Sequence, residues 1–234
     1  MRSGSPPFLS RIVTAATNRF IACGERLKER AVLKRVRSVA GPVAGTIKSF
    51  TSRAELCTLF QLASSGPNGA VLVEIGSYLG ASACFLGAAA VLNEGSLICV
   101  DTWHNETMPE GDSNTWDRFQ LNVSQLESVL TTIRQDSMTV SGDRFPPAVW
   151  MAFIDGDHGV AAARHDSLIV ADRIVEDGII AFHDAIWFPG VAVVIGELLA
   201  SGEWRIGGLV GNLLWLQKSN RHGKSHSRLH RPHA

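Results

Sequence analysis

The sequence predicts an α/β fold: a seven-stranded, mostly parallel sheet with helices on both faces and an antiparallel hairpin at its C-terminal edge. From Ala70 onward, short apolar runs alternate with stretches of helical periodicity, the pattern of parallel strands joined by crossover helices. Only residues 210–212 separate the last two runs, and so short a connection joins antiparallel strands. The 234 residues, 45% of them hydrophobic, suffice for one domain with additional segments.

The apolar runs define the individual elements. Strands are expected at 70–75, 96–101, 131–135, 150–155, 178–183, 204–209 and 213–217. Helices are expected in four of the first five gaps, at 81–92, 115–130, 160–175 and 191–200. Before the sheet, Ser52 and Glu55 form the S-x-x-E pattern of a capping box, which predicts a short helix through residue 63.

Charge is distributed unevenly along the chain, although it carries 22 basic and 22 acidic residues. Residues 1–40 hold nine Lys or Arg and two Glu, whereas residues 41–217 hold eight basic and twenty acidic residues, a net charge of −12. Nucleic-acid binding depends on a basic face, so this acidic segment argues against a nucleic-acid partner. No window reaches the roughly 18 apolar residues of a membrane span, and arginines stand where a signal peptide is apolar. We therefore expect a cytoplasmic protein.

The two ends of the chain differ from the central segment. Residues 9–39 show apolar residues at helical spacing with Arg and Lys between them, which predicts one or two amphipathic basic helices. We expect this segment to pack on its own core or on a second subunit of a homodimer, and weak contact with an anionic membrane surface is the alternative. The expected organisation is a basic helical extension over 1–51, one domain over 52–218, and a disordered basic, His-rich tail over 219–234.

Polar residues follow the first three predicted strands, where open α/β sheets bind ligands. Residues 74–82 form a glycine turn that opens a helix, and the free N–H groups of a helix start favour a carboxylate or phosphate. Gly76 and Gly80 are spaced GxxxG rather than GxGxxG, which weakens a dinucleotide interpretation. Asp101 follows about 20 residues later, where an acid can accept both ribose hydroxyl protons. A tight turn and a helix cap explain each feature alone; together they favour an adenosine-containing ligand.

Ionisable residues gather after the fourth and fifth strands. The sequence FIDGDH places Asp155, Asp157 and His158 after one apolar strand, and His183 with Asp184 follow the next. Helix N-caps would account for Asp155 or Asp184 separately, but not for five ionisable groups at one edge of the sheet. Such clusters shift the pKa values of their members and mark functional sites.

Taken in order and spacing, the motifs VEIGSYLGAS, CVDTW, FIDGDH and GIIAFHD resemble the class I S-adenosylmethionine-dependent methyltransferases. The similarity is greatest to the small O-methyltransferase branch that contains macrolide and aminocoumarin sugar methyltransferases, and it covers residues 52–218. The resemblance implies a Rossmann-like sheet and S-adenosylmethionine as cofactor. It assigns the methionine end of the cofactor to one loop, the ribose to Asp101, and the adenine to the pair Asp136 and Ser137. The loop residues so assigned are Glu74, Gly76, Ser77, Gly80, Ala81 and Ser82.

The resemblance also implies roles for the ionisable cluster. In metal-dependent members, an acid after the fourth strand and an acidic pair after the fifth bind magnesium, which corresponds here to Asp155, His183 and Asp184. Magnesium prefers oxygen ligands. The imidazole of His183 therefore points away, favours manganese, or signals that no metal binds. His158 corresponds to the general base of the family, and Asp157 is the competing candidate.

The expected reaction is O-methylation of a hydroxyl on a small molecule such as a sugar or another natural product. The polar loop over residues 102–116 is long enough to act as a lid over such a substrate. Two other functions stay open. A metal-dependent hydrolase could use the five ionisable residues to activate water, but it leaves the glycine loop and Asp101 without a role. A non-catalytic module could hold the cofactor and act through its basic N-terminal helices.

Overall fold

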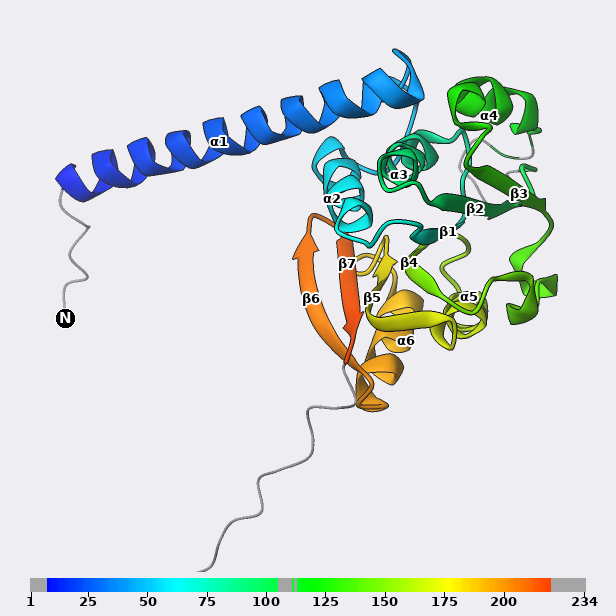
Figure 1. The fold of residues 1–234 in the computed structure, drawn as a ribbon. Coiled ribbons are helices and arrows are strands. Elements are labelled where there is room, and N and C mark those ends of the chain that lie inside the picture. Colours follow the sequence, from blue (N-terminus) through cyan, green and yellow to red (C-terminus); the bar gives the residue numbers. More distant parts are fainter. Residues whose placement is uncertain (1–7, 105–110, 112, 220–234) are drawn as a thin grey trace, which may run out of the picture.

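The computed structural model describes residues 8–104, 111 and 113–219, with side chains from residue 24 onward (Figure 1). Seven strands form one sheet in the order β3-β2-β1-β4-β5-β7-β6. Their bounds are β1 (Val71–Ile75), β2 (Ser96–Asp101), β3 (Leu130–Arg134), β4 (Val149–Ile154), β5 (Ile174–Phe182), β6 (Trp204–Val210) and β7 (Leu213–Lys218). The first five strands pair in parallel, and β7 pairs antiparallel with both β5 and β6. The predicted fold class is confirmed, with β7 inserted inside the sheet and β6 at its edge.

Helices cover both faces of the sheet. They are α1 (Phe8–Ala40), α2 (Arg53–Ser64), α3 (Ala81–Leu92), α4 (Trp116–Val123), α5 (Val160–Ala171) and α6 (Pro189–Ala200). One hydrophobic cluster joins α1, α2, α3 and α4 to one face, and a second joins α5 and α6 to the other (Figure 1). Successive strand residues alternate between the clusters, as Leu72 and Val73 do, because side chains along a strand point to opposite faces.

Two element boundaries differ from the sequence prediction. The helix predicted over 115–130 ends at Val123 and continues only as a 3-10 turn, because Leu130 already pairs in β3. The helix predicted over 160–175 ends at Ala171, and β5 begins at Ile174 rather than at residue 178. The pairing of β4 with β5 shifts register between Val149 and Met151, so the polar residues before Gly178 interrupt the apolar pattern without ending the strand.

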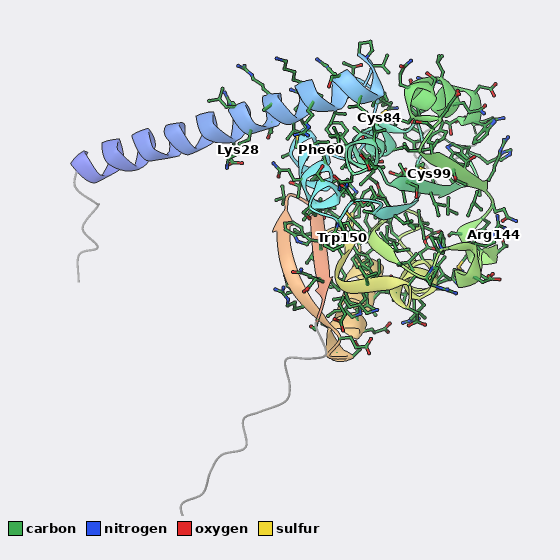
Figure 2. The ribbon with its side chains drawn as sticks, viewed as in Figure 1. Lys28, Phe60, Cys84, Cys99, Arg144 and Trp150 are labelled. Carbon is green, nitrogen blue, oxygen red and sulfur yellow. The ribbon has the colours of Figure 1, made fainter. Side chains whose placement is uncertain are left out.

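The N-terminal segment forms one continuous helix. Val36 and Ala40 near the end of α1 are completely buried in the cluster that contains α3, while the beginning of the helix extends away from the body of the molecule (Figure 1). Figure 2 shows the same contrast, with Lys28 outside the body and Cys84 and Cys99 inside it. The predicted tail lies almost entirely outside the described residues. None of the helices in the described part of the chain is both long and apolar enough to cross a membrane.

Candidate active site at the carboxyl ends of the strands

The loop between β1 and α3 packs directly against the loop after β4. Gly76 has φ +89°, and a Cβ atom at this position would lie 2.1 Å from the carbonyl oxygen of Asp155. Only glycine fits such a conformation and so close an approach. Gly80 (φ +84°) is the N-cap of α3 and offers no side-chain cap, so the first N–H groups of α3 stay available to an anionic ligand. The glycine loop and the ionisable cluster therefore form one continuous site.

Asp101 fixes the shape of this loop. Its Oδ2 atom accepts hydrogen bonds from the backbone N–H groups of Ser77 (2.7 Å) and Tyr78 (2.8 Å), and its Oδ1 atom accepts one from Trp103 (2.5 Å). The carboxylate at the end of β2 thus holds two neighbouring loops together. A carboxylate accepts about four hydrogen bonds, so three donors leave it capacity for a ligand hydroxyl.

Glu74 lies beneath the same loop and is completely buried. Its Oε2 atom accepts hydrogen bonds from Ser77 Oγ (2.5 Å) and Cys99 Sγ (3.3 Å). Oε1 is buried without a hydrogen bond of ordinary geometry among the described residues, although the nearby Ser82 hydroxyl lowers the pKa of the carboxyl. Burial raises the pKa of this carboxyl to about 7. A buried acceptor without a partner is costly unless a ligand donates to it. This atom therefore fits a cofactor that carries an amino group.

The turn after β3 and helix α5 hold two further carboxylates, Asp136 and Asp166. Asp136 Oδ1 accepts a hydrogen bond from the backbone N–H of Met138 (2.9 Å), so it caps the 3-10 turn Ser137–Thr139. Asp166 of α5 is fully buried nearby, and the neighbouring Ser137 hydroxyl and His165 compensate its burial only in part. Burial raises its pKa to about 6. The sequence pattern did not single out Asp166, because it lies within a helix and far from any motif.

Four of the five predicted ionisable residues meet at the ends of β4 and β5. His183 Nδ1 lies 3.2 Å from Asp155 Oδ1 and 3.3 Å from Asp184 Oδ2. Oδ2 of Asp184 also lies 2.9 Å from Nε2 of His158, so this oxygen lies between the two imidazoles. Asp157 is exposed instead, and its Oδ1 atom accepts a hydrogen bond from the backbone of Gly159 (2.6 Å).

These contacts set the protonation of the cluster. Burial favours neutral His183, but hydrogen bonds and charges from Asp155 and Asp184 outweigh it and raise the pKa of the imidazole to about 10. Burial raises the pKa of Asp155, whereas the two imidazoles overcome burial and hold the pKa of Asp184 below its usual range. The contact with Asp184 raises the pKa of His158. The cluster thus holds a buried imidazolium beside two carboxylates and a second, more accessible imidazole.

Three side chains of this cluster form a candidate cation site. Among the described residues, Asp155, His158 and Asp184 offer ligand atoms that all lie within 4.8 Å of one another. His183 contacts both of these carboxylates from a buried position. Two carboxylates with an imidazole suit manganese better than magnesium, which prefers oxygen ligands alone.

Two further residues hold the cluster in place, and the sequence analysis assigned neither to the site. Glu55 accepts a hydrogen bond from Ser52 N, which confirms the capping box, and its Oε1 atom accepts one from the backbone of Asn212 (both 2.6 Å). Its Oε2 atom also lies 3.6 Å from Nε2 of His183. Asn212 Nδ2 donates to Asp184 Oδ1, and Asn212 Oδ1 accepts from Ile186 N (2.9 Å). The capping motif revealed Glu55, but no local pattern connects it to Asn212.

Three of the five residues other than glycine with a positive φ in the described part of the chain lie at this edge of the sheet, while Glu94 and Asp177 lie elsewhere. Tyr78, Trp103 and Asp184 follow β1, β2 and β5, and they have φ values of 46°, 55° and 56°. A positive φ is unfavourable for residues other than glycine and often accompanies functional sites. The predicted lid begins here: Trp103 packs on Trp116 and Phe119, with ring centroids 4.6 Å and 4.7 Å away. Residues 105–110 and 112 of the lid lie outside the described part of the chain.

Comparisons with known proteins agree with this geometry. Residues 73–185 match the model of a family described as a methyltransferase domain. No curated protein sequence matches the chain. CalS11, a TDP-rhamnose 3′-O-methyltransferase of calicheamicin biosynthesis, is 13% identical with a TM-score of 0.56, over 82% of this chain and 93% of that chain.

Two other solved structures share the fold. PaMTH1 from Podospora anserina, bound to S-adenosylhomocysteine, is 12% identical with a TM-score of 0.59, over 94% of this chain and 100% of that chain. MycE from the mycinamycin pathway, solved with magnesium, S-adenosylhomocysteine and mycinamycin VI, is 14% identical with a TM-score of 0.54, over 83% of this chain and 56% of that chain. The match to a methyltransferase domain covers residues 73–185, just under half of the chain, and the solved structures show that the chain shares their Rossmann-like fold.

Proposed function

We propose that the protein transfers a methyl group from S-adenosylmethionine to a hydroxyl group of a small molecule. One observation carries the proposal: the glycine loop that precedes α3 touches the backbone of Asp155, so the cofactor loop adjoins the pair formed by His158 and Asp184. Methyl transfer from a sulfonium is an in-line displacement that depends on alignment of the acceptor oxygen with the methyl carbon. Adjacent sites for cofactor and base meet that requirement.

S-adenosylmethionine, when bound, supplies an electrophilic methyl group, and we assign its binding to the loops after β1, β2 and β3. The Oε1 atom of Glu74 accepts a hydrogen bond from the amino group of the methionine end. The start of α3, from Gly80 through Ala81 and Ser82, faces its carboxylate. Asp101 would receive one ribose hydroxyl with its remaining acceptor capacity, and Asp136 and Ser137 would line the adenine.

His158 is the proposed general base. Its Nδ1 atom accepts the hydroxyl proton of the acceptor, while Asp184, 2.9 Å from Nε2 on the other side of the ring, orients the imidazole and stabilises the imidazolium that forms. A histidine titrates near neutral pH, which suits it to accept a proton and release it to water. Asp157 is the weaker candidate, because its carboxylate caps the turn before α5. The match to a methyltransferase domain does not favour the hydrolase or the non-catalytic module.

Metal assistance is a separate part of the proposal. Asp155 and Asp184 would hold a divalent cation together with one imidazole nitrogen, and the cation would lower the pKa of the acceptor hydroxyl. If the ligand is the predicted His183, it would have to lose its proton first. If it is His158, that residue would not serve as the base. Equilibrium dialysis with Mn²⁺ and with Mg²⁺ tests this. Binding of Mn²⁺ that Asp155→Asn abolishes supports the site. Equal retention of Mn²⁺ by the wild type and by Asp155→Asn contradicts it.

We assign α1 a packing role rather than a catalytic one. Its end is buried against α3, and the apolar spacing of its earlier residues would suit a second subunit or, more weakly, an anionic membrane surface. The acidic central segment supports a small-molecule acceptor rather than a nucleic acid. Sedimentation of the full chain and of a chain lacking residues 1–23 distinguishes a homodimer from a monomer.

Isothermal titration of S-adenosylhomocysteine tests the cofactor assignment. We expect binding in the wild type and at least tenfold weaker binding in Asp101→Ala, because a charge-assisted hydrogen bond is worth about 1.5–3 kcal/mol. Asp143→Ala is the matched control, since Asp143 is exposed and contacts only its own turn. Labelled methyl transfer to a panel of hydroxylated compounds then tests the reaction. Absence of binding in the wild type, or equal binding in all three proteins, contradicts the proposal.

A further inference from the structure

The segment that follows Asp184 is apolar and exposed. Residues 185–196 contain no charged side chain, and the indole N–H of Trp187 is their one side-chain hydrogen-bonding group. Within this segment, Ile186 is 61% exposed, Trp187 75% and Phe188 43%. Three consecutive large apolar side chains in water are unfavourable, and patches of this kind mark binding surfaces. We call residues 186–188 the apolar platform.

The apolar platform adjoins the proposed base. The ring of Phe188 stacks on the imidazole of His158, with centroids 4.1 Å apart and planes inclined by 21°. The start of α6 also packs against the loop that carries His158, since a Cβ atom at Gly190 would lie 2.3 Å from the carbonyl oxygen of His158. A molecule that lies on the platform can therefore present a hydroxyl to His158 without leaving the apolar surface.

The exposure of the apolar platform is built into the backbone. The N–H of Ala185 donates to the carbonyl of Asn212 (3.2 Å), and the N–H of Ile186 donates to the side chain of Asn212 (2.9 Å). At the other end, the N–H of Phe188 donates to the carbonyl of Asp184 (3.1 Å), and Pro189 begins α6. These bonds prevent the segment from turning its side chains inward. A preorganised surface loses little entropy when a ligand binds.

The chemistry of the apolar platform restricts what can lie on it. A sugar carries hydroxyl groups around its ring, and each hydroxyl that loses water without a new partner costs free energy. The platform offers one N–H group to replace that water. A planar apolar body instead gains free energy from contact with Trp187 and Phe188.

We infer that the methyl acceptor carries its hydroxyl group on a planar, apolar body, and that this body binds to Ile186, Trp187 and Phe188. The inference rests on the proposed function and adds the chemical class of its substrate. It assigns Trp187, the most exposed of the three, as a specificity-determining residue rather than a catalytic one. A polar sugar acceptor would find no comparable support on this side of the site.

Binding of 2-naphthol, a fluorescent phenol with a planar apolar body, tests the inference. Fluorescence anisotropy is measured with the full chain saturated with S-adenosylhomocysteine. We expect binding that Trp187→Ala weakens at least about tenfold, as loss of an aromatic anchor does. Ile206→Ala is the matched control, because Ile206 is 58% exposed on the edge strand β6, and it should bind like the wild type. Methyl glucoside should not displace the naphthol at equal concentration.

Several outcomes overturn the inference and leave the proposed function intact. The first is a wild-type protein that binds S-adenosylhomocysteine but not 2-naphthol. The second is equal affinity of Trp187→Ala and Ile206→Ala for 2-naphthol. The third is displacement of bound 2-naphthol by methyl glucoside. A dimer that Trp187→Ala dissociates in sedimentation velocity would show that the platform is a subunit interface. Failure of the proposed function gives a different result, because no protein then binds S-adenosylhomocysteine. Thermal melting of each variant verifies that it is folded.

Discussion

The two halves of the site hold their carboxylates in different ways. In the half formed by β1 and β2, Glu74 and Asp101 contact donors that stay neutral: backbone N–H groups, a hydroxyl and a thiol. In the half formed by β4 and β5, Asp155 and Asp184 contact two imidazoles. The donors of the first half keep their protons near neutral pH and so fix a shape, although the buried carboxyl of Glu74 itself has a pKa of about 7. In the second half, His183 has a pKa of about 10 and keeps its proton, whereas the more accessible imidazole of His158 is the group that can exchange one. The first half is therefore suited to hold a cofactor, and the second to move a proton.

His158→Ala should break the proton-moving half with the largest effect. We expect turnover to fall by about 10²–10⁴, the usual contribution of a general base, while affinity for S-adenosylhomocysteine is unchanged. Asp157→Asn is the matched variant and should stay within a few-fold of the wild type. Initial rates of labelled methyl transfer and calorimetry measure the two quantities. Parallel losses of turnover and cofactor affinity in His158→Ala would contradict the division between the halves.

Glu74→Gln tests the fixed half through stability. The pKa of Glu74 is about 7 in the folded protein against 4.5 ordinarily, so the folded state keeps a proton that the unfolded state loses between these values. Stability contributed by this group is therefore lost as pH rises from about 4.5 to 7. Glutamine removes the ionisation, so at pH 8 the free energy of unfolding should rise by up to about 3 kcal/mol, with little change at pH 4.

Urea unfolding at both pH values measures this change. The exposed acid Glu127 provides the control substitution Glu127→Gln, which should alter stability equally little at either pH. If Glu74→Gln also binds S-adenosylhomocysteine more weakly, the buried carboxylate of Glu74 lowers the stability of the protein but contributes to cofactor binding. That result would strengthen the contrast between the two halves of the site. A variant whose unfolding free energy does not increase at pH 8 would contradict the raised pKa.

Asn212→Ala tests how the proton-moving half is held in place and should have the smallest effect. It removes the hydrogen bond to Asp184 and leaves the N–H of Ile186 without its acceptor. We expect turnover to fall about tenfold, equivalent to one hydrogen bond to a charged group, with cofactor affinity unchanged. Asn212→Asp keeps the acceptor for Ile186 but loses the donor to Asp184, so recovery of turnover in this variant would rule out the role assigned to the donor.

Local patterns in the sequence were sufficient for most of the fold. Apolar runs and the capping box of Ser52 predicted the strands and α2, because these signals act over a few residues. The start of β5 was missed because Glu176 and Asp177 interrupt its apolar pattern. The sequence also predicted that Asp155, His158, His183 and Asp184 converge, since they end neighbouring parallel strands. It could not predict the link from Glu55 to Asn212, because 157 residues separate them and only tertiary packing brings them together.

The place of Asn212 in the chain has a consequence for how the enzyme matures. A nascent chain that has passed Asp184 already carries both carboxylates and both imidazoles of the cluster, but it still lacks the amide that orients Asp184. That amide arrives with the hairpin of β6 and β7, which inserts β7 between β5 and the edge. Domains are commonly completed in this vectorial way during translation. The ribosome therefore releases the proposed catalytic groups first and the group that aligns them last, so a chain stopped before Asn212 would carry these groups without their alignment.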